Sequence, residues 1–206
     1  MRLRGVLSAI LLPVLLLAAP GVAARAAAQA TPPQWKATVT ASVLVAPPPI
    51  LLTTTRDLYF GNVGPSQVIS VPARPTYPVG TWAAGARFGN MAKTVRYGVR
   101  FTLPTQLVNG TATIPVSFNG TQYGWLCVWN QTVGTPGVCA VQDASFNPAS
   151  YTSAASPMVI DLPNNTPQNH VFAADVYVGG QLSVPAGSLK PGTYSAPIVI
   201  TVSVIG

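Results

Sequence analysis

The sequence is poor in the side chains that carry chemistry. It contains no glutamate, four aspartates, one histidine and two cysteines among 206 residues. A Ser-His-Asp arrangement could use His170 with Asp161 or Asp175, but no nucleophile-elbow motif accompanies them. Nothing places two aspartates at the separation that a glycosidase needs. We therefore expect a protein that is not an enzyme and that uses no cofactor or metal.

Charge is also scarce, because Asp, Glu, Lys and Arg together make up 7% of the chain. Without residues 1–28, eight Lys and Arg residues face four Asp, so the formal charge falls from +7 to +4. These basic residues are spread along the chain, whereas phosphate neutralisation needs a clustered basic face. We expect no nucleic-acid partner. Helix-forming glutamate and lysine are replaced by Gly, Pro, Ser, Thr, Asn and Val, which favour strands joined by turns.

Residues 1–28 have the three parts of a secretory signal peptide. Arg2 and Arg4 precede an apolar run from Val6 to Ala19, and small residues at Ala26 to Ala28 fit a cleavage site. Pro20 and Gly21 end the apolar run before it reaches the roughly 20 residues of a membrane span. We expect an exported chain without a membrane span, located in the periplasm, at the cell surface or outside a bacterium. Residues 29–36 would form a short N-terminal segment, and residues 37–206 a single domain.

The two cysteines, Cys127 and Cys139, lie close together in the sequence of an exported chain. In an oxidising compartment such a pair most simply forms a disulfide. A metal site would need further ligands, and His170 is the one histidine available. We predict a disulfide that pins a local loop.

The most regular pattern after the signal peptide is the alternation of apolar and polar residues, which is typical of strands with one buried face. It is clearest in two segments, Thr94 to Leu103 and the stretch that follows a predicted type II turn at Pro191-Gly192. The apolar positions are Val95, Tyr97, Val99, Phe101 and Leu103 in the first segment, and Tyr194, Ala196, Ile198, Ile200, Val202 and Val204 in the second. Eight to ten such strands predict an all-β sandwich.

Glycine-containing dipeptides predict how some of these strands connect. Asn109-Gly110 and Asn119-Gly120 are typical of type I′ hairpin turns and predict a three-stranded meander from Thr94 to Trp129. Gly179-Gly180 predicts a further hairpin between two strands, His170 to Val178 and Gln181 to Val184. Val79 to Ala92, rich in Gly and Ala, leaves a loop and a single helical turn open.

Two segments carry a resemblance to a known family. They are Asp57 to Val63 and the stretch from Gly180 through the turn into the last strand, with motif residues Asp57, Leu58, Phe60, Gly61, Gly192, Thr193 and Tyr194. Together they resemble the secreted bacterial family called domain of unknown function 4402, which is similar to spore coat protein U and more distantly to chaperone-usher pilins. The resemblance covers most of the chain from Ala37 to Val204. The chain departs from it at Tyr123 to Cys139 and in ending without an aromatic residue.

The resemblance implies an immunoglobulin-like, pilin-like antiparallel β-sandwich that serves as a structural or surface-assembly subunit. It would work through strand pairing and packing, and its partners would be further copies or a periplasmic chaperone and usher. In pilins an N-terminal segment of one subunit completes the sandwich of the next. Ala37 to Val45, with Val39, Ala41, Val43 and Val45 on one face, has the character of such a donor strand. It could equally be the domain's own first strand, and both interpretations stay open.

A second function class comes from the aromatic residues near the cysteines. Tyr123, Trp125 and Trp129 share strand parity with Cys127, while Leu126 and Val128 point to the opposite side. If Leu126 and Val128 face the core, the three aromatics could form an exposed row that binds a surface glycan or a protein. The chain would then be a secreted, adhesin-like binding module. Alternatively the loop from Asn130 to Cys139 folds back and covers them.

Overall fold

A computed structural model describes residues 50–74, 80–93, 95–134, 138–163, 170–187 and 189–205, and the main chain of residues 38–43. The predicted signal peptide, the segment 29–36 and Val45 lie outside the described residues. The described residues all belong to one compact unit, Thr31–Gly206. Within them, no helix has the length and apolar character needed to cross a membrane.

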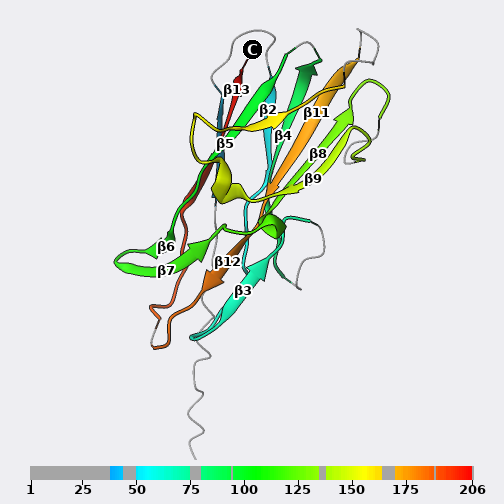
Figure 1. The fold of residues 1–206 in the computed structure, drawn as a ribbon. Coiled ribbons are helices and arrows are strands. Elements are labelled where there is room, and N and C mark those ends of the chain that lie inside the picture. The colour runs from blue at the N-terminus through cyan, green and yellow to red at the C-terminus, as the bar shows by residue number, and fades with distance from the viewer. Residues whose placement is uncertain are drawn as a thin grey trace, which may run out of the picture. The chain divides into compact units, whose positions relative to one another are not determined.

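The fold is all-β, as the alternating pattern predicts, and its antiparallel sheets pack against one another (Figure 1). One sheet has the order β1-β13-β5-β10, the second β2-β4-β11-β8-β9 and the third β3-β12-β7-β6. The strands are β1 (Thr38–Val43), β2 (Leu51–Arg56), β3 (Val68–Val71), β4 (Ala84–Ala92), β5 (Tyr97–Thr102), β6 (Gln106–Asn109), β7 (Ala112–Ser117), β8 (Gly124–Asn130), β9 (Gln142–Phe146), β10 (Met158–Ile160), β11 (Val171–Val178), β12 (Gly180–Ser183) and β13 (Pro197–Val204). Two short 3-10 helices, η1 (Thr121–Tyr123) and η2 (Pro148–Tyr151), interrupt them.

The core contains most of the apolar positions of the two clearest alternating segments, but Val95 and Leu103 are only partly buried and Val204, at the end of β13, is 37% exposed, against the prediction. Tyr97, Val99 and Phe101 of β5 are at most 1% exposed, and Arg100 and Thr102 on the other face are exposed. The same holds for β13, whose inward residues Ile198, Ile200 and Val202 are fully buried. The period-two prediction is therefore confirmed for both strands.

The first Asn-Gly dipeptide does connect a hairpin, although its turn differs from the prediction. Asn109 pairs with Ala112, so the two loop residues are Gly110 and Thr111. Gly110 has φ +63°, and neither Asn109 nor Thr111 has a positive φ. A positive φ at the first loop residue alone is typical of a type II′ turn, so the type I′ prediction is wrong here.

The second Asn-Gly dipeptide does not connect a hairpin. The meander prediction is wrong on both sides of the central strand, because β5 pairs with β13 and β10 and not with β7. β7 pairs with β6 and β12, whereas β8 pairs with β9 and β11. The chain passes from one sheet to the other through η1. Asn119 and Gly120 instead contact Asn147: the Asn147 side chain donates to Asn119 Oδ1 at 2.8 Å and accepts from the Gly120 amide at 3.1 Å.

Gly179-Gly180 also joins two sheets where a hairpin was predicted. β11 and β12 do not pair with each other, and the chain runs from one into the other without reversing (Figure 1). A Cβ atom on Gly179 would lie 2.0 Å from the Val71 carbonyl oxygen, so another strand passes too close for any side chain. Glycine at these positions lets the two backbones approach closely. Close backbone approach is a use of glycine distinct from its use in turns.

Val79 to Ala92 contains a central strand, β4, so both alternatives for this segment are wrong. β4 pairs with β2 on one side and with β11 on the other. Its outward Gly85 lies beneath neighbouring side chains, since a Cβ there would meet Thr55 Oγ1 at 2.2 Å and Tyr177 Cε1 at 2.8 Å. The space around Gly85 is so crowded that no larger residue fits. Small residues of this kind give no clear alternation of apolar and polar positions, so the strand is hard to recognise in the sequence.

Tyr97 links the core to the pH dependence of stability. Its buried hydroxyl accepts a hydrogen bond from the Ala92 amide at 2.9 Å, and burial raises the pKa of Tyr97 above its ordinary value. Burial therefore favours the neutral form of the Tyr97 hydroxyl in the folded chain. The contribution of this group to stability is complete below the pKa of about 10 that tyrosine has in the unfolded chain, and it is lost as the pH rises through the higher pKa of the folded chain.

We expect the free energy of unfolding to fall between about pH 8 and about pH 10.5, and to fall less in Tyr97→Phe. At about pH 8 this variant should be roughly 1 kcal/mol less stable, because the Ala92 amide loses its acceptor. Urea unfolding at both pH values measures the slope. Tyr177, whose pKa burial also raises, should leave part of the slope in the variant. An identical slope in both proteins would contradict the assignment to Tyr97.

Candidate functional sites: the edge of the terminal strand, the outer sheet face and an aromatic cleft

The first candidate site is the edge of the C-terminal strand. β13 pairs with β5 antiparallel on one side and with β1 on the other. The pairing with β1 is parallel, the one parallel pair among the described strands, and sets Val39 opposite Ile198, Ala41 opposite Ile200 and Val43 opposite Val202. β1 lies at the margin of this sheet. The candidate donor segment thus covers the edge of the chain's own last strand.

The residues of the family-like motifs lie in two segments between the named strands, the first of them extended at Leu58 and Tyr59. Leu58 and Phe60 are buried, Asp57 is half-buried, and Gly61 follows them with φ +78°. In the second segment, Gly192 has φ +133° and Thr193 is exposed. Tyr194 is fully buried, and its hydroxyl donates to the Lys190 carbonyl at 3.0 Å. The positive φ expected at Gly192 is present, and the motif tyrosine anchors the turn that leads into β13.

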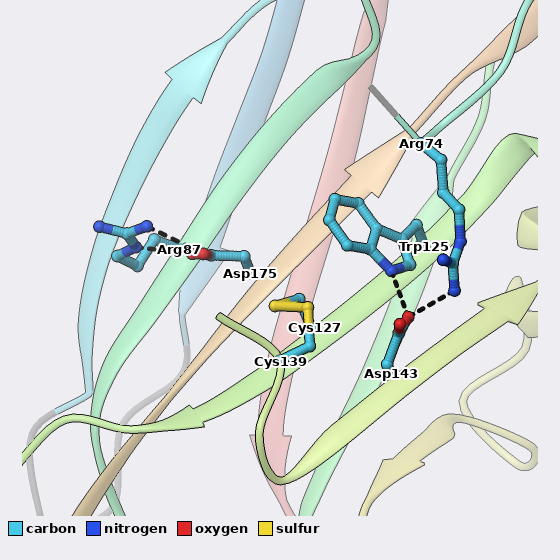
Figure 2. Close-up of a disulfide and its surroundings, with 7 residues drawn as sticks. All are labelled: Arg74, Arg87, Trp125, Cys127, Cys139, Asp143 and Asp175. Atoms are coloured by element: carbon cyan, nitrogen blue, oxygen red, sulfur yellow. Dashed lines mark hydrogen bonds and ion pairs between the residues drawn. A yellow bond between two sulfur atoms is a disulfide. The ribbon is translucent and has the colours of Figure 1, made fainter. Parts of the chain in front are cut away.

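The second candidate site is the outer face of the sheet β2-β4-β11-β8-β9. Cys127 of β8 forms the predicted disulfide with Cys139 (Figure 2). Cys127 also packs on the same face as Trp125 and Trp129. Leu126 and Val128 point into the core, which is the condition under which the exposed aromatic row was expected.

On this face, two stacked aromatic rings lie between two arginine side chains. The rings of Trp125 and Tyr177 stack with centroids 5.2 Å apart. The Arg56 guanidinium lies 5.3 Å from the Tyr177 ring centroid, and that of Arg74 lies 5.4 Å from the Trp125 ring centroid. The Asp143 carboxylate forms an ion pair with Arg74 and accepts a hydrogen bond of 2.7 Å from the Trp125 indole N–H (Figure 2). Such contacts stabilise the sheet surface.

The exposed row of three aromatics does not form. Tyr123 belongs to η1, is 3% exposed, and shares a hydrogen bond of 2.8 Å with Ser70 Oγ. Trp129 is 4% exposed, because it packs with the disulfide and beneath Arg87. Trp125 is half-buried within the stack. The alternative in which the loop from Asn130 to Cys139 covers these aromatics holds only in part: Cys139 packs with Trp129, whereas Tyr123 and Trp125 are covered by other residues.

A buried carboxylate lies at the centre of the same face. Asp175 of β11 is 1% exposed and receives two hydrogen bonds from Arg87 of β4, at 2.6 Å to Oδ1 and 2.8 Å to Oδ2 (Figure 2). The hydrogen bond to Asp175 raises the pKa of Arg87. The Arg87 guanidinium also lies 5.3 Å from the Trp129 ring centroid. Both partners come from adjacent strands in register, and a two-pronged pair of this kind orders both side chains.

The titratable groups weighed for catalysis have other partners. His170 Nδ1 lies 2.6 Å from Asn130 Nδ2, Asp175 pairs with Arg87, and Asp161 lies 3.8 Å from Arg96. Among the described residues, no three His, Cys, Asp or Glu side chains gather closely enough to hold a metal ion.

A third candidate site, which the sequence patterns did not single out, is a cleft beside Tyr59 and Trp82. The two residues pair through their main chains, with Tyr59 N–H to Trp82 O at 2.8 Å and the reverse bond at 3.0 Å. Their ring centroids are 4.5 Å apart with a tilt of 31°. The cleft has a volume of about 530 Å³ and also contacts Phe60, Gly61, Asn62, Ile69, Gly80 and Thr81. The sequence signal that could have indicated this cleft is the position of Tyr59 between two residues of the buried face, Leu58 and Phe60, because alternation then places Tyr59 on the outer face.

Comparison with known proteins adds no relative from which a function could be carried over. Neither a protein-family model nor a curated protein matches this sequence significantly.

Proposed function

We propose that this chain is an exported structural or surface-assembly subunit, pilin-like in character, that joins to other copies by exchanging its N-terminal strand. The observation that carries the proposal is the edge of β13. The last strand is apolar on its inner face and has β1 as its neighbour on one side. Export is supported by the disulfide and by the N-terminal sequence.

The pairing of β1 explains how one chain could join another. Without β1, β13 would present a row of unpaired amide and carbonyl groups beside a fully buried apolar face, the situation that invites an incoming strand. The β1 segment of a second copy carries the same sequence and can occupy the same place through the same main-chain hydrogen bonds. Because donor and acceptor surfaces differ, each copy can give one strand and receive one, so the contact propagates into an open polymer.

The proposal is tested by removing the strand and supplying it separately. The exported full chain is expected to form SDS-resistant ladders, and a variant lacking Gln29 to Val45 is expected to form none. A synthetic peptide of residues 29–45 should bind this variant one to one and raise its unfolding midpoint. The control peptide carries Thr40→Pro and Ala41→Pro, which together remove two successive amide hydrogens, one of which must face β13, and it should bind at least tenfold more weakly.

Three results would count against strand exchange. The deletion variant could fold and still polymerise, which excludes the donor role. The full chain could stay monomeric at all concentrations, which indicates that β1 serves only its own domain. The control peptide could bind as well as the native one, which excludes strand pairing. If the deletion variant does not fold alone, refolding it together with each peptide gives the same comparison.

A further inference from the structure

We infer that the cleft beside Tyr59 and Trp82 binds the ring of a neutral sugar within an oligosaccharide. This inference is independent of strand exchange, because the cleft is built by residues outside β1 and β13. It would give a surface subunit an adhesive site.

The cleft is built from an aromatic wall and an open main-chain floor. Buried Leu58 and Phe60 hold Tyr59 in place, and the two hydrogen bonds to Trp82 fix the second ring beside it. Gly61 and Gly80 have φ +78° and +75°. A Cβ on Gly61 would approach the Gly80 carbonyl oxygen to 3.2 Å, and a Cβ on Gly80 would meet no atom of the described residues within 4 Å. The glycines thus leave room beside the rings.

Three polar groups around this wall are unpaired within the described residues. The Asn62 amide, the Tyr59 hydroxyl and the Trp82 indole N–H have no hydrogen-bond partner within the part of the chain that the structure describes. Asn62 is exposed, and Trp82, at 39%, is one of the more exposed large hydrophobic residues. A flat apolar surface bordered by a few polar groups is typical of a small-ligand site.

The chemistry of the lining selects the ligand class. Among the described residues that line the cleft, none has a charged side chain, which favours a neutral ligand over an anion or a cation. A pyranose ring has an apolar C–H face that can lie on an indole, and hydroxyl groups at its rim that both donate and accept. The Asn62 amide offers two donors and one acceptor, which matches hydroxyl groups. A proline-rich peptide, the other ligand that lies on aromatic walls, presents chiefly carbonyl acceptors and would leave the Asn62 oxygen unused.

The test is a titration of the exported full chain with neutral oligosaccharides, namely cellotetraose, maltotetraose, mannotetraose and tetra-N-acetylchitotetraose, and with decaproline as the competing ligand class. We expect at least one sugar to change tryptophan fluorescence with a saturable dependence and to release measurable heat. Trp82→Ala should weaken that binding at least tenfold, Trp82→Phe should retain most of it, and Asn62→Ala should weaken it several-fold. Val133→Ala, an exposed apolar change away from the cleft lining, is the matched control and should bind normally.

The outcomes separate cleanly. Sugar binding that Trp82→Ala and Asn62→Ala weaken, while both variants keep the unfolding midpoint of the native chain, supports the inference. Binding of decaproline in place of every sugar would assign the cleft to peptides and overturn it. A lack of saturable binding by any of the four sugars at millimolar concentration, or sugar binding unchanged in Trp82→Ala, would also overturn it. None of these results depends on whether the chain forms ladders.

Discussion

Arg87→Ala should lower the free energy of unfolding by about 3 kcal/mol, the lower end of the range for breaking a buried ion pair. The loss is large because Asp175 is 1% exposed and would remain as a buried carboxylate without its two hydrogen bonds from Arg87. The lower end applies because Arg87 itself is 35% exposed. Part of the loss is packing, since the Arg87 guanidinium also covers the Trp129 ring.

A double-mutant cycle separates these contributions. Asp175→Ala in the Arg87→Ala background should recover part of the lost stability, because no buried charge then remains unpaired. Urea unfolding of the native chain, both single variants and the double variant gives the coupling free energy. Arg96→Ala is the matched control: its partner Asp161 is 75% exposed and 3.8 Å away, so the change should cost less than about 1 kcal/mol. Equal losses for Arg87→Ala and Arg96→Ala would contradict the role given to the buried pair.

Removing the disulfide should cost about 3 kcal/mol of stability. Cys127 and Cys139 are 12 residues apart, and the constraint that such a bridge puts on the unfolded chain corresponds to about that free energy. The variant Cys127→Ala with Cys139→Ala keeps the strand sequence and removes the link. Urea unfolding, compared with the native chain with and without a reducing agent, measures the loss.

The disulfide should also decide the exposure of Trp129. This ring packs with Cys127 and Cys139 and is 4% exposed. Without the bridge we expect the fluorescence emission to shift to longer wavelength and iodide to quench it more strongly. Trp129→Phe in the disulfide-free background is the control, because it should abolish that additional shift. A disulfide-free chain with the native unfolding midpoint and native emission would show that the bridge does not hold this part of the face.

Local pattern predicted the inside and outside of strands well, and the connections between strands poorly. Parity alone placed Leu126 and Val128 on the face opposite Trp125, Cys127 and Trp129, as found, and the structure shows that Leu126 and Val128 face the core. Alternation fails where small residues dominate, as in β4, because Gly and Ala carry little signal of which face is buried. It also cannot tell whether a Gly-containing dipeptide reverses the chain or lets two strands cross, as at Gly179.

The candidate sites depended still more on the whole fold. Parity placed the aromatics near the cysteines on one side of β8, but it could not show that the disulfide and Arg87 cover Trp129 or that Tyr123 lies in η1. Tyr59 and Trp82 are distant in sequence, and only their main-chain pairing makes one wall of them.

The sequence by itself determined the fold class, the buried faces of β5 and β13 and the disulfide, because alternation is a local property of extended chain and two cysteines allow one bridge. The tertiary structure alone decided that β1 lies parallel to β13, that Arg87 meets Asp175 and that Tyr59 meets Trp82. The physical reason is that each strand has backbone hydrogen-bonding groups along two edges, and any other strand can pair with them. Which strand does so is selected by the packing of the whole chain, beyond the reach of neighbouring residues.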